Sequence, residues 1–324
     1  MYTHLTQDER YQIAAGIEVG MSLRAIGRQL SRSPSTISRE IARNGTERGY
    51  KGLLAQRQRQ SRASKSQQRI RIQPGNWRVI GDLIRLDWSP EQISNRAAYE
   101  GTFKISTERI YQYIYADKAA GGALHQSLRC QKSYRKRYGS GRERRGNHPD
   151  RTSIHDRPER IESRTDVGHW EGDTIVGKGR KSAVFTAIER KTRFTRIGKA
   201  ASRHRVAVHR TIRRRLSPFK DQVQSLTVDN GREFTRHKGL EKALSMQVYF
   251  ADPYASWQRG TNENTNGLIR QYLPKDDDFS GVSGAMIRKI ETRLNKRPRK
   301  CLGYLTPHEA FYGVELQLTV ALGG

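Results

Sequence analysis

The first 45 residues carry apolar side chains at the spacing of amphipathic helices. These positions are Leu5, Ile13, Ile17, Leu23, Ile26 and Leu30. Residues 31–34 interrupt the pattern, because Ser33 is a good helix N-cap and Pro34 a favoured first helical residue. The helix that follows presents Ile37 and Ile41 on one face. The pattern predicts a helix-turn-helix, although any small three-helix core would share it.

The opposite face of that last helix is polar. It consists of Ser35, Thr36, Ser38, Arg39 and Arg43. Short polar and arginine side chains on such a helix can contact base edges in the major groove, while the aliphatic face holds the helix on its domain. We therefore predict that residues 1–45 form a DNA-binding domain and that these five side chains contact DNA.

Residues 46–75 lose the apolar period and are rich in Gln, Arg, Ser and Lys. They are predicted to be a basic linker, or a helix that becomes ordered only on DNA. Helical periodicity returns in residues 76–117, where Ser89 and Ser106 are placed to cap helices. A second helix-turn-helix that binds DNA and a plain helical spacer both fit this pattern, and we predict the former.

Residues 118–165 are basic and contain scattered glycines, with too few apolar residues for a core. We predict a flexible linker that follows the phosphate backbone through Arg135, Lys136 and Arg137. A disordered connector that makes no contact with DNA is the alternative.

From residue 166 the apolar pattern becomes that of short strands and helices in alternation. Strands are predicted at 173–177, 182–189, 194–197, 225–228 and 247–250, and helices at 202–216, 239–244, 262–274 and 283–295. Before the last helix at 283–295, the order β-β-β-α-β-α-β-α is that of a ribonuclease H-like α/β fold. The chain is thus predicted to be multidomain, with all-α helix-turn-helix regions followed by an α/β catalytic domain over 166–324 that ends with a helix.

Three acidic residues stand at the ends of these elements. Asp173 begins the first predicted strand, Asp229 follows the fourth, and Glu263 lies at the start of the helix after the fifth. Ligand groups gather at strand ends in α/β sheets, and the first and fourth strands are neighbours in this topology. We predict that the three carboxylates converge. Each has a simpler reading alone: Asp229-Asn230-Gly231 is also a turn sequence, and Glu263 also suits a helix N-terminus.

Converging carboxylates favour phosphodiester chemistry with hard cations. Mg²⁺ takes oxygen ligands, and two such ions about 3.5–4 Å apart can activate the attacking oxygen and stabilise the leaving one. No Ser- or Tyr-centred arrangement argues for a protein nucleophile. Glu171 and Glu233 flank the first two aspartates and are expected to support or position them.

The composition agrees with a nucleic-acid partner. The chain has 61 Lys and Arg against 32 Asp and Glu, a formal charge of +29 that favours double-stranded DNA over a surface charged only for solubility. The two cysteines, Cys130 and Cys301, form no C-x-x-C pattern, so neither a disulfide framework nor a zinc cluster is expected. We expect no membrane segment and a cytoplasmic, nucleoid-associated protein.

The three acids lie in longer motifs, which are HWEGDTIVG at residues 169–177, TVDNGREF at 227–234 and QRGTNENTNGLIRQYLPK at 258–275. In that order, these motifs resemble the first aspartate motif, the second aspartate motif and the glutamate helix of DDE transposases of the insertion-sequence-30 family. Residues 294–300, 306–311 and the helix-turn-helix at 23–43 are also similar. The chain departs from the family at Asp276-Asp277-Asp278, where the family usually has Gly-Thr.

The resemblance implies an integrase-type core that binds the terminal inverted repeats of an insertion sequence. Water and then the freed 3′ hydroxyl would attack, with two Mg²⁺ ions, or Mn²⁺ in their place, held by Asp173, Asp229 and Glu263. It also implies a homo-oligomer, at least a dimer. By position, Asn262, Asn264, Asn266 and Arg270 would contact DNA or support the glutamate helix, although ordinary helix surface is the alternative. Trp257 could stack on a displaced base or belong to the core.

Other functions fit parts of the sequence. A catalytically inactive, transposase-like DNA-binding regulator would keep the fold, but the intact triad argues against it. A nuclease that cuts without joining would not need two helix-turn-helix regions. A structural nucleoid protein would need no triad.

Overall fold

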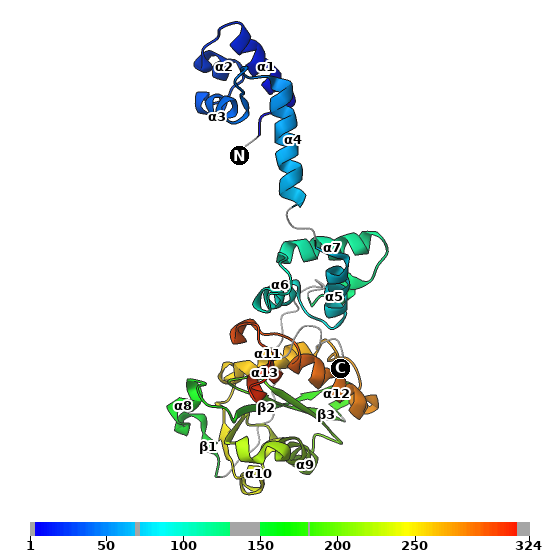
Figure 1. The fold of residues 1–324 in the computed structure, drawn as a ribbon. Helices are drawn as coiled ribbons and strands as arrows, with labels where there is room; N and C mark the ends of the chain where they lie inside the picture. The colour runs from blue at the N-terminus through cyan, green and yellow to red at the C-terminus, as the bar shows by residue number, and fades with distance from the viewer. Residues whose placement is uncertain (1–3, 69–71, 130–149, 181, 316–324) are drawn as a thin grey trace. The chain divides into compact units, whose positions relative to one another are not determined.

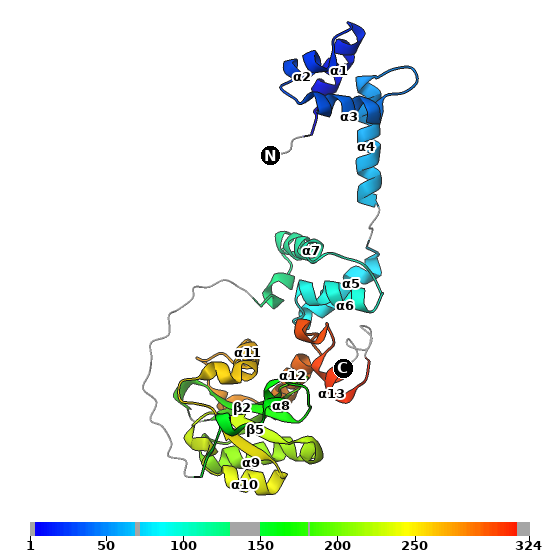
Figure 2. The same cartoon turned by 90° about the vertical axis from the view of Figure 1, so that its left-hand side faces the viewer.

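The computed structural model describes residues 4–68, 72–129, 150–180 and 182–315. The chain divides into two compact units, Met1–Arg71 and Ile72–Gly324, shown in Figures 1 and 2. The DNA contacts predicted at Arg135, Lys136 and Arg137 lie outside the described residues. No helix in the described part of the chain is both long and apolar enough to cross a membrane.

The first unit contains the predicted helix-turn-helix. Its helices are α1 (Gln7–Glu18), α2 (Leu23–Gln29), α3 (Pro34–Asn44) and α4 (Gly52–Gln68). Ser33 caps α3 and Pro34 occupies its first turn, as predicted. Ile13, Ile26 and Ile37 are fully or almost fully buried in the core between these helices.

Of the two predictions for residues 46–75, the basic linker is wrong over most of the length. A helix is present instead, because α4 occupies most of the segment and packs on α1. Tyr50 and Ala55 are buried in the core of the unit, and the Gln56 side chain accepts a hydrogen bond from Arg10 at 3.2 Å. A few residues near its start therefore anchor this helix. The remainder has no apolar period, which is why the pattern resembled a linker.

The predicted helical region at 76–117 is present as α5 (Pro74–Arg85), α6 (Pro90–Tyr99) and α7 (Thr107–Ala119). Ser89 and Ser106 cap α6 and α7, as the sequence indicated. These helices enclose their own apolar cluster, which includes Ile84, Ile93 and Ile110. Whether they bind DNA stays a prediction.

Buried polar contacts join α5–α7 to the end of the catalytic domain. A guanidinium nitrogen of Arg96 lies 2.5 Å from a carboxylate oxygen of Glu309, and the two side chains are 3% and 1% exposed. Arg96 also pairs with Glu100 at 2.6 Å. Asp87, in the α5–α6 connection, accepts hydrogen bonds from Arg293 and the Tyr272 hydroxyl. The three helices and the catalytic domain therefore belong to one unit.

The catalytic domain is built on one mixed sheet. Its strands are β1 (Thr152–Ser153), β2 (His169–Val176), β3 (Ala183–Glu189), β4 (Thr195–Ala200), β5 (Ser225–Val228) and β6 (Gln247–Phe250). The order is β1-β6-β5-β2-β3-β4. The pairs β1/β6, β6/β5 and β5/β2 are parallel, whereas β2/β3 and β3/β4 are antiparallel.

Helices cover both faces of this sheet (Figures 1 and 2). On one face lie α9 (Arg205–Leu216) and α10 (His237–Leu244), which pack on Phe185 and Leu226. On the other lie α11 (Gly260–Ile269) and α12 (Gly284–Asn295), which pack on Ile175 and Val184. The short helices α8 (Glu159–Glu162) and α13 (Pro307–Tyr312) complete the domain.

Three predicted boundaries need correction. The first strand begins at His169, so Asp173 lies inside β2 and not at its start. Residues 152–162 belong to the domain, not to the predicted flexible linker 118–165, because β1 pairs with β6 and Ile161 is buried. The glutamate helix runs over Gly260–Ile269 and ends before Pro274. The fourth and fifth predicted strands match β5 and β6.

We expect Arg96→Met to reduce the free energy of unfolding of the second unit by about 3–5 kcal/mol, because it removes the positive charge that is paired with the buried Glu309 carboxylate. Urea unfolding followed by circular dichroism measures this. The control is Arg85→Met, whose ion pair with Asp82 is exposed and should matter little. Equal losses of unfolding free energy in the two variants would contradict the role of Arg96 in joining α5–α7 to the catalytic domain.

Candidate active site

Asp173 and Asp229 lie side by side on neighbouring parallel strands. In the register of β2 and β5, Glu171 is opposite Thr227, and both aspartates lie two residues further along. The Arg259 guanidinium stands between them, with nitrogens 3.6 Å from an oxygen of Asp173 and 3.7 Å from one of Asp229. The structure thus brings these two predicted carboxylates together around one cation.

The environment makes ionisation of Asp173 costly. Burial raises the pKa of Asp173 to about 6, with Asp229 and Glu233 adding to the rise and Arg259 opposing it. The Asp173 side chain is 26% exposed, so solvent still reaches it. An excess of negative charge at an accessible carboxylate pair is the condition under which a cation binds.

Helix α11 is fixed against β2 by Glu171, which has no exposed surface. Its carboxylate accepts a hydrogen bond from the Asn262 backbone at 2.9 Å and one from Arg190 at 2.8 Å. The Asn262 side-chain amide donates in turn to the Glu171 carbonyl at 2.9 Å. Glu171 therefore holds α11 on β2, and the supporting or positioning role predicted for it towards the aspartates stays a prediction.

Asn262 and Asn266 act on the carboxylates from α11. Asn262 is 1% exposed and bonded to β2, so the predicted DNA contact at Asn262 is wrong in this structure, and its role is to support the helix. The Asn266 amide donates to Asp173 at 3.0 Å, which orients that carboxylate. Arg270 donates to the carbonyl of Val176 at 3.1 Å, and its predicted DNA contact stays a prediction.

Glu263 is a predicted metal ligand that the structure does not bring together with Asp173 and Asp229. It is exposed on α11, and no group of three His, Cys, Asp or Glu among the described residues is placed to hold a metal ion. Residues four before it and three after it, Arg259 and Asn266, share its helical face, and both reach Asp173. The role of Glu263 as the third carboxylate therefore stays a prediction, and its position on the same helical face as Arg259 and Asn266 supports it.

The donor set suits a hard divalent cation. Asp173 and Asp229 offer carboxylate oxygens, which Mg²⁺ prefers, and Glu263 could add a third carboxylate from the same face of α11. Arg259 supplies positive charge at the place where the cation would be held. In ligand chemistry the residues fit Mg²⁺, with two of the three carboxylates already together.

Sequence reasoning missed Arg259 and undervalued Glu233. The Glu233 carboxylate accepts a hydrogen bond from Thr174 at 2.6 Å, beside Asp173 in β2. Arg259 is one of 61 basic residues, and the sequence signal that could have identified it as a site residue is its position four residues before Glu263. His169 and Trp170, at the start of the first aspartate motif, are both buried in β2.

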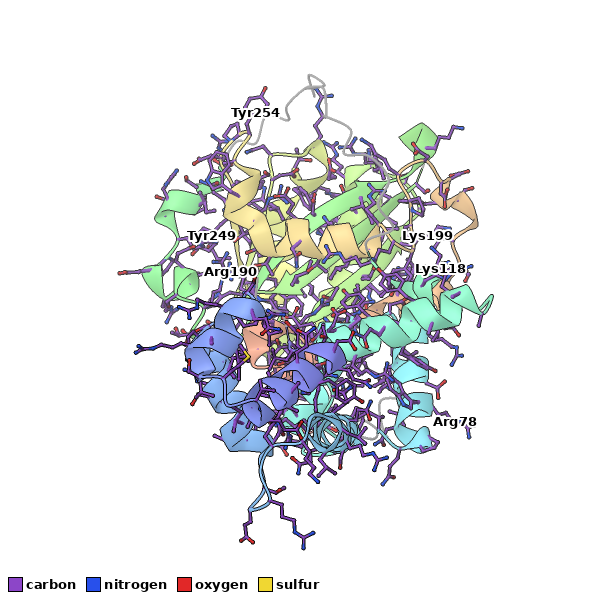
Figure 3. The ribbon with its side chains drawn as sticks, turned by 90° about the horizontal axis from the view of Figure 1, so that it is seen from above. Arg78, Lys118, Arg190, Lys199, Tyr249 and Tyr254 are labelled. Carbon is purple, nitrogen blue, oxygen red and sulfur yellow. The ribbon has the colours of Figure 1, made fainter. Side chains whose placement is uncertain are left out.

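Two other sets of predicted residues are exposed. On α3, Ser35, Ser38, Arg39 and Arg43 are exposed and Thr36 is half-buried, so this face is open to a ligand. Trp257 is 75% exposed, which excludes the core reading. Tyr254 is 79% exposed and lies at the rim of the catalytic unit, whereas Arg190 is inside it (Figure 3).

We expect Asp173→Asn to raise the melting temperature of the metal-free protein at pH 8. The raised pKa means that the wild-type protein loses stability as pH increases from 3.8 through about 6, and the amide has no charge to desolvate. The gain should shrink as pH falls from 7 towards 4. Differential scanning calorimetry in EDTA measures it.

The matched control is Asp221→Asn, which removes one negative charge at an exposed position. A gain at Asp173 that does not change with pH, or that equals the gain at Asp221, would contradict the desolvated carboxylate.

Comparison with known proteins agrees with this arrangement. Residues 1–44 match the model of a helix-turn-helix domain, and residues 165–256 match that of an integrase core domain. The chain is 41% identical to the transposase for insertion sequence element IS4351 of Bacteroides fragilis, over 99% of both chains. It is 38% identical to the transposase InsI for insertion sequence element IS30A of Escherichia coli (strain K12), over 94% of this chain and 82% of that one.

Among solved structures, the catalytic core domain of BIV integrase aligns with 45% of this chain and 94% of its own length. The identity is 22% and the TM-score 0.36.

Proposed function

We propose, since this chain belongs to the insertion-sequence-30 family of transposases, that it binds the terminal inverted repeats of an insertion sequence and cuts and joins DNA there with two Mg²⁺ ions. As a transposase with an integrase core, it is a DDE-type enzyme that cleaves phosphodiester bonds, and that core family depends on divalent metal. The observation that carries the finer proposal is the pairing of Asp173 with Asp229 around Arg259.

Asp173, Asp229 and Glu263 would hold the metal ions. Bound there, the ions would favour deprotonation of the attacking oxygen and stabilise the charge on the leaving oxygen. Asn266 keeps one oxygen of Asp173 oriented through its amide, and Glu171 keeps α11 in place. Arg259 balances the charge of the two aspartates in the metal-free protein and lies within reach of a phosphate once cations replace it there.

No covalent bond between protein and DNA is needed in this scheme. Water attacks first and frees a 3′ hydroxyl, which then attacks a second strand at the same carboxylates. Two ends must be held together for the second step, so we propose a homo-oligomer, at least a dimer. The exposed face of α3 and the +29 charge of the chain support duplex DNA as the partner.

Glu263→Gln is expected to abolish both metal-dependent nicking and joining of a labelled terminal-repeat duplex, because the amide cannot supply a charged ligand. Binding of the same duplex in EDTA should be nearly unchanged. Glu159→Gln, at an exposed position in α8, is the matched control and should cut normally. Full activity in Glu263→Gln would remove Glu263 from the triad.

If the wild-type protein bound correct ends tightly but gave no metal-dependent product, the inactive regulator would become the better reading. Loss of binding together with cleavage in Glu263→Gln would instead indicate a folding role.

Removal of residues 1–71 should reduce the preference for terminal repeats over random duplex more than it reduces affinity for random duplex. The reason is that this unit carries the exposed α3 face, while much of the basic charge remains in the second unit. Competition binding at fixed salt measures both affinities. A preference that survives the deletion would contradict base reading by α3 and would favour α5–α7.

A further inference from the structure

A basic cavity lies on the flank of α11 that faces away from the two aspartates. Arg164, Arg193 and Arg299 line it, and of the described residues around it none is acidic. Its volume is about 210 Å³. A water needs only about 10–15 Å³ of such space, so the cavity has room for a phosphate group.

No acidic side chain among the described residues lines this arginine cavity, and Glu171 and Glu162 act on Arg164 from outside its lining. The Nε of Arg299 is buried and has no hydrogen-bond partner. Burial, and next to it the nearby Arg297, lower the pKa of Arg299 to about 10. Burial likewise lowers the pKa of Arg164, with Arg193 next in effect. Half-buried guanidinium groups that lie near other positive charges are stabilised by an anion with several oxygens.

The cavity is also shaped by the backbone and by α11. Arg164 and Arg193 both have left-handed backbones, with φ of 57° and 63°, which side chains rarely adopt. Arg193 is held towards α11 by a hydrogen bond of 2.7 Å to the Thr261 hydroxyl. Asn264 and Thr265 add polar groups from the same helix. The arginines are thus held in place around the space that they line.

The position of the cavity points to DNA backbone and not to a separate small ligand. Residues 261, 264 and 265 of α11 line it, whereas Asn266 of the same helix donates a hydrogen bond to Asp173. A helix is about 10 Å across and one DNA strand rises about 3.4 Å per nucleotide. A strand cut at the aspartates would therefore bring a phosphate to the cavity roughly three nucleotides away.

A second cavity continues this path. It has a volume of about 360 Å³ and shares Arg164 with the first, while Arg157, Arg190 and the exposed Trp257 also line it. Here Glu162 pairs with both Arg157 and Arg190, so the net charge is smaller. Trp257 offers a stacking surface for an unpaired base, which a strand leaving the arginine cavity could reach.

We propose that Arg164, Arg193 and Arg299 form a binding site for one backbone phosphate of the DNA that the enzyme processes. This rests on the proposed function. The site takes no part in the chemistry; it positions the strand relative to the carboxylates. It is separate from the base-reading face of α3 and needs no metal ion.

Cys301 lines the cavity, is exposed and has a free thiol, so it reports on occupancy. In full-length protein with Cys130→Ser, Cys301 is the one remaining thiol. We expect terminal-repeat DNA in EDTA to slow maleimide alkylation of Cys301 at least tenfold, and millimolar inorganic phosphate to slow it less. Arg299→Gln should lose this protection and reduce the salt dependence of DNA binding by about one phosphate contact.

The matched control is Arg213→Gln, which removes one positive charge from the exposed end of α9 and should keep the protection. Arg193→Gln should repeat the loss if Arg299→Gln fails to fold. Full protection in a folded Arg299→Gln or Arg193→Gln, or no protection of wild-type Cys301 by DNA, would overturn the proposal. Protection by phosphate but not by DNA would overturn the assignment to backbone.

Metal-dependent cleavage by a protein whose Cys301 stays unprotected would leave the transposase proposal standing and end this one. Protection of Cys301 by DNA without any metal-dependent cleavage would leave the phosphate site standing and contradict the transposase proposal.

Discussion

Glu171 carries the contact on which the rest of the catalytic domain depends. Its buried carboxylate binds the first turn of α11 through Asn262 and the turn after β3 through Arg190. A carboxylate without exposed surface is stable only when it is paired and hydrogen-bonded. Glu171 therefore fixes the position of α11 on β2, two residues from Asp173.

That fixed position gives the two flanks of α11 different chemistry. On one flank, Arg259 and Asn266 reach Asp173, so the helix modulates the charge and orientation of the carboxylate pair. On the other, Thr261 holds Arg193 beside a cavity with an excess of positive charge. A single short helix thus lies between a site suited to a cation and a site suited to an anion, which is the order of charges that a phosphodiester strand requires.

Much of this could be predicted, and the failures share a cause. Ser33 and Ser89 predict where α3 and α6 begin, because the residue type alone indicates a helix N-cap. The strands β5 and β6 could be predicted because each is a short apolar run. By contrast, β2 begins with His169-Trp170-Glu171, where a buried acid hides the strand.

The strand β1 was missed, and the helix α4 was only the alternative to a linker, for a related reason. Only the start of α4 packs, and β1 is held by backbone pairing, so side-chain pattern reveals neither. The pairing of Arg259 with two aspartates depends on tertiary structure and has no local signature.

The contact between helices α5–α7 and Glu309 has consequences for how the protein folds during synthesis. Because Arg96 is synthesised more than two hundred residues before its partner, α5–α7 can fold on the ribosome while their docking surface does not yet exist. The contact that unites these helices with the catalytic domain forms only after nearly all of the sheet and its helices have left the ribosome.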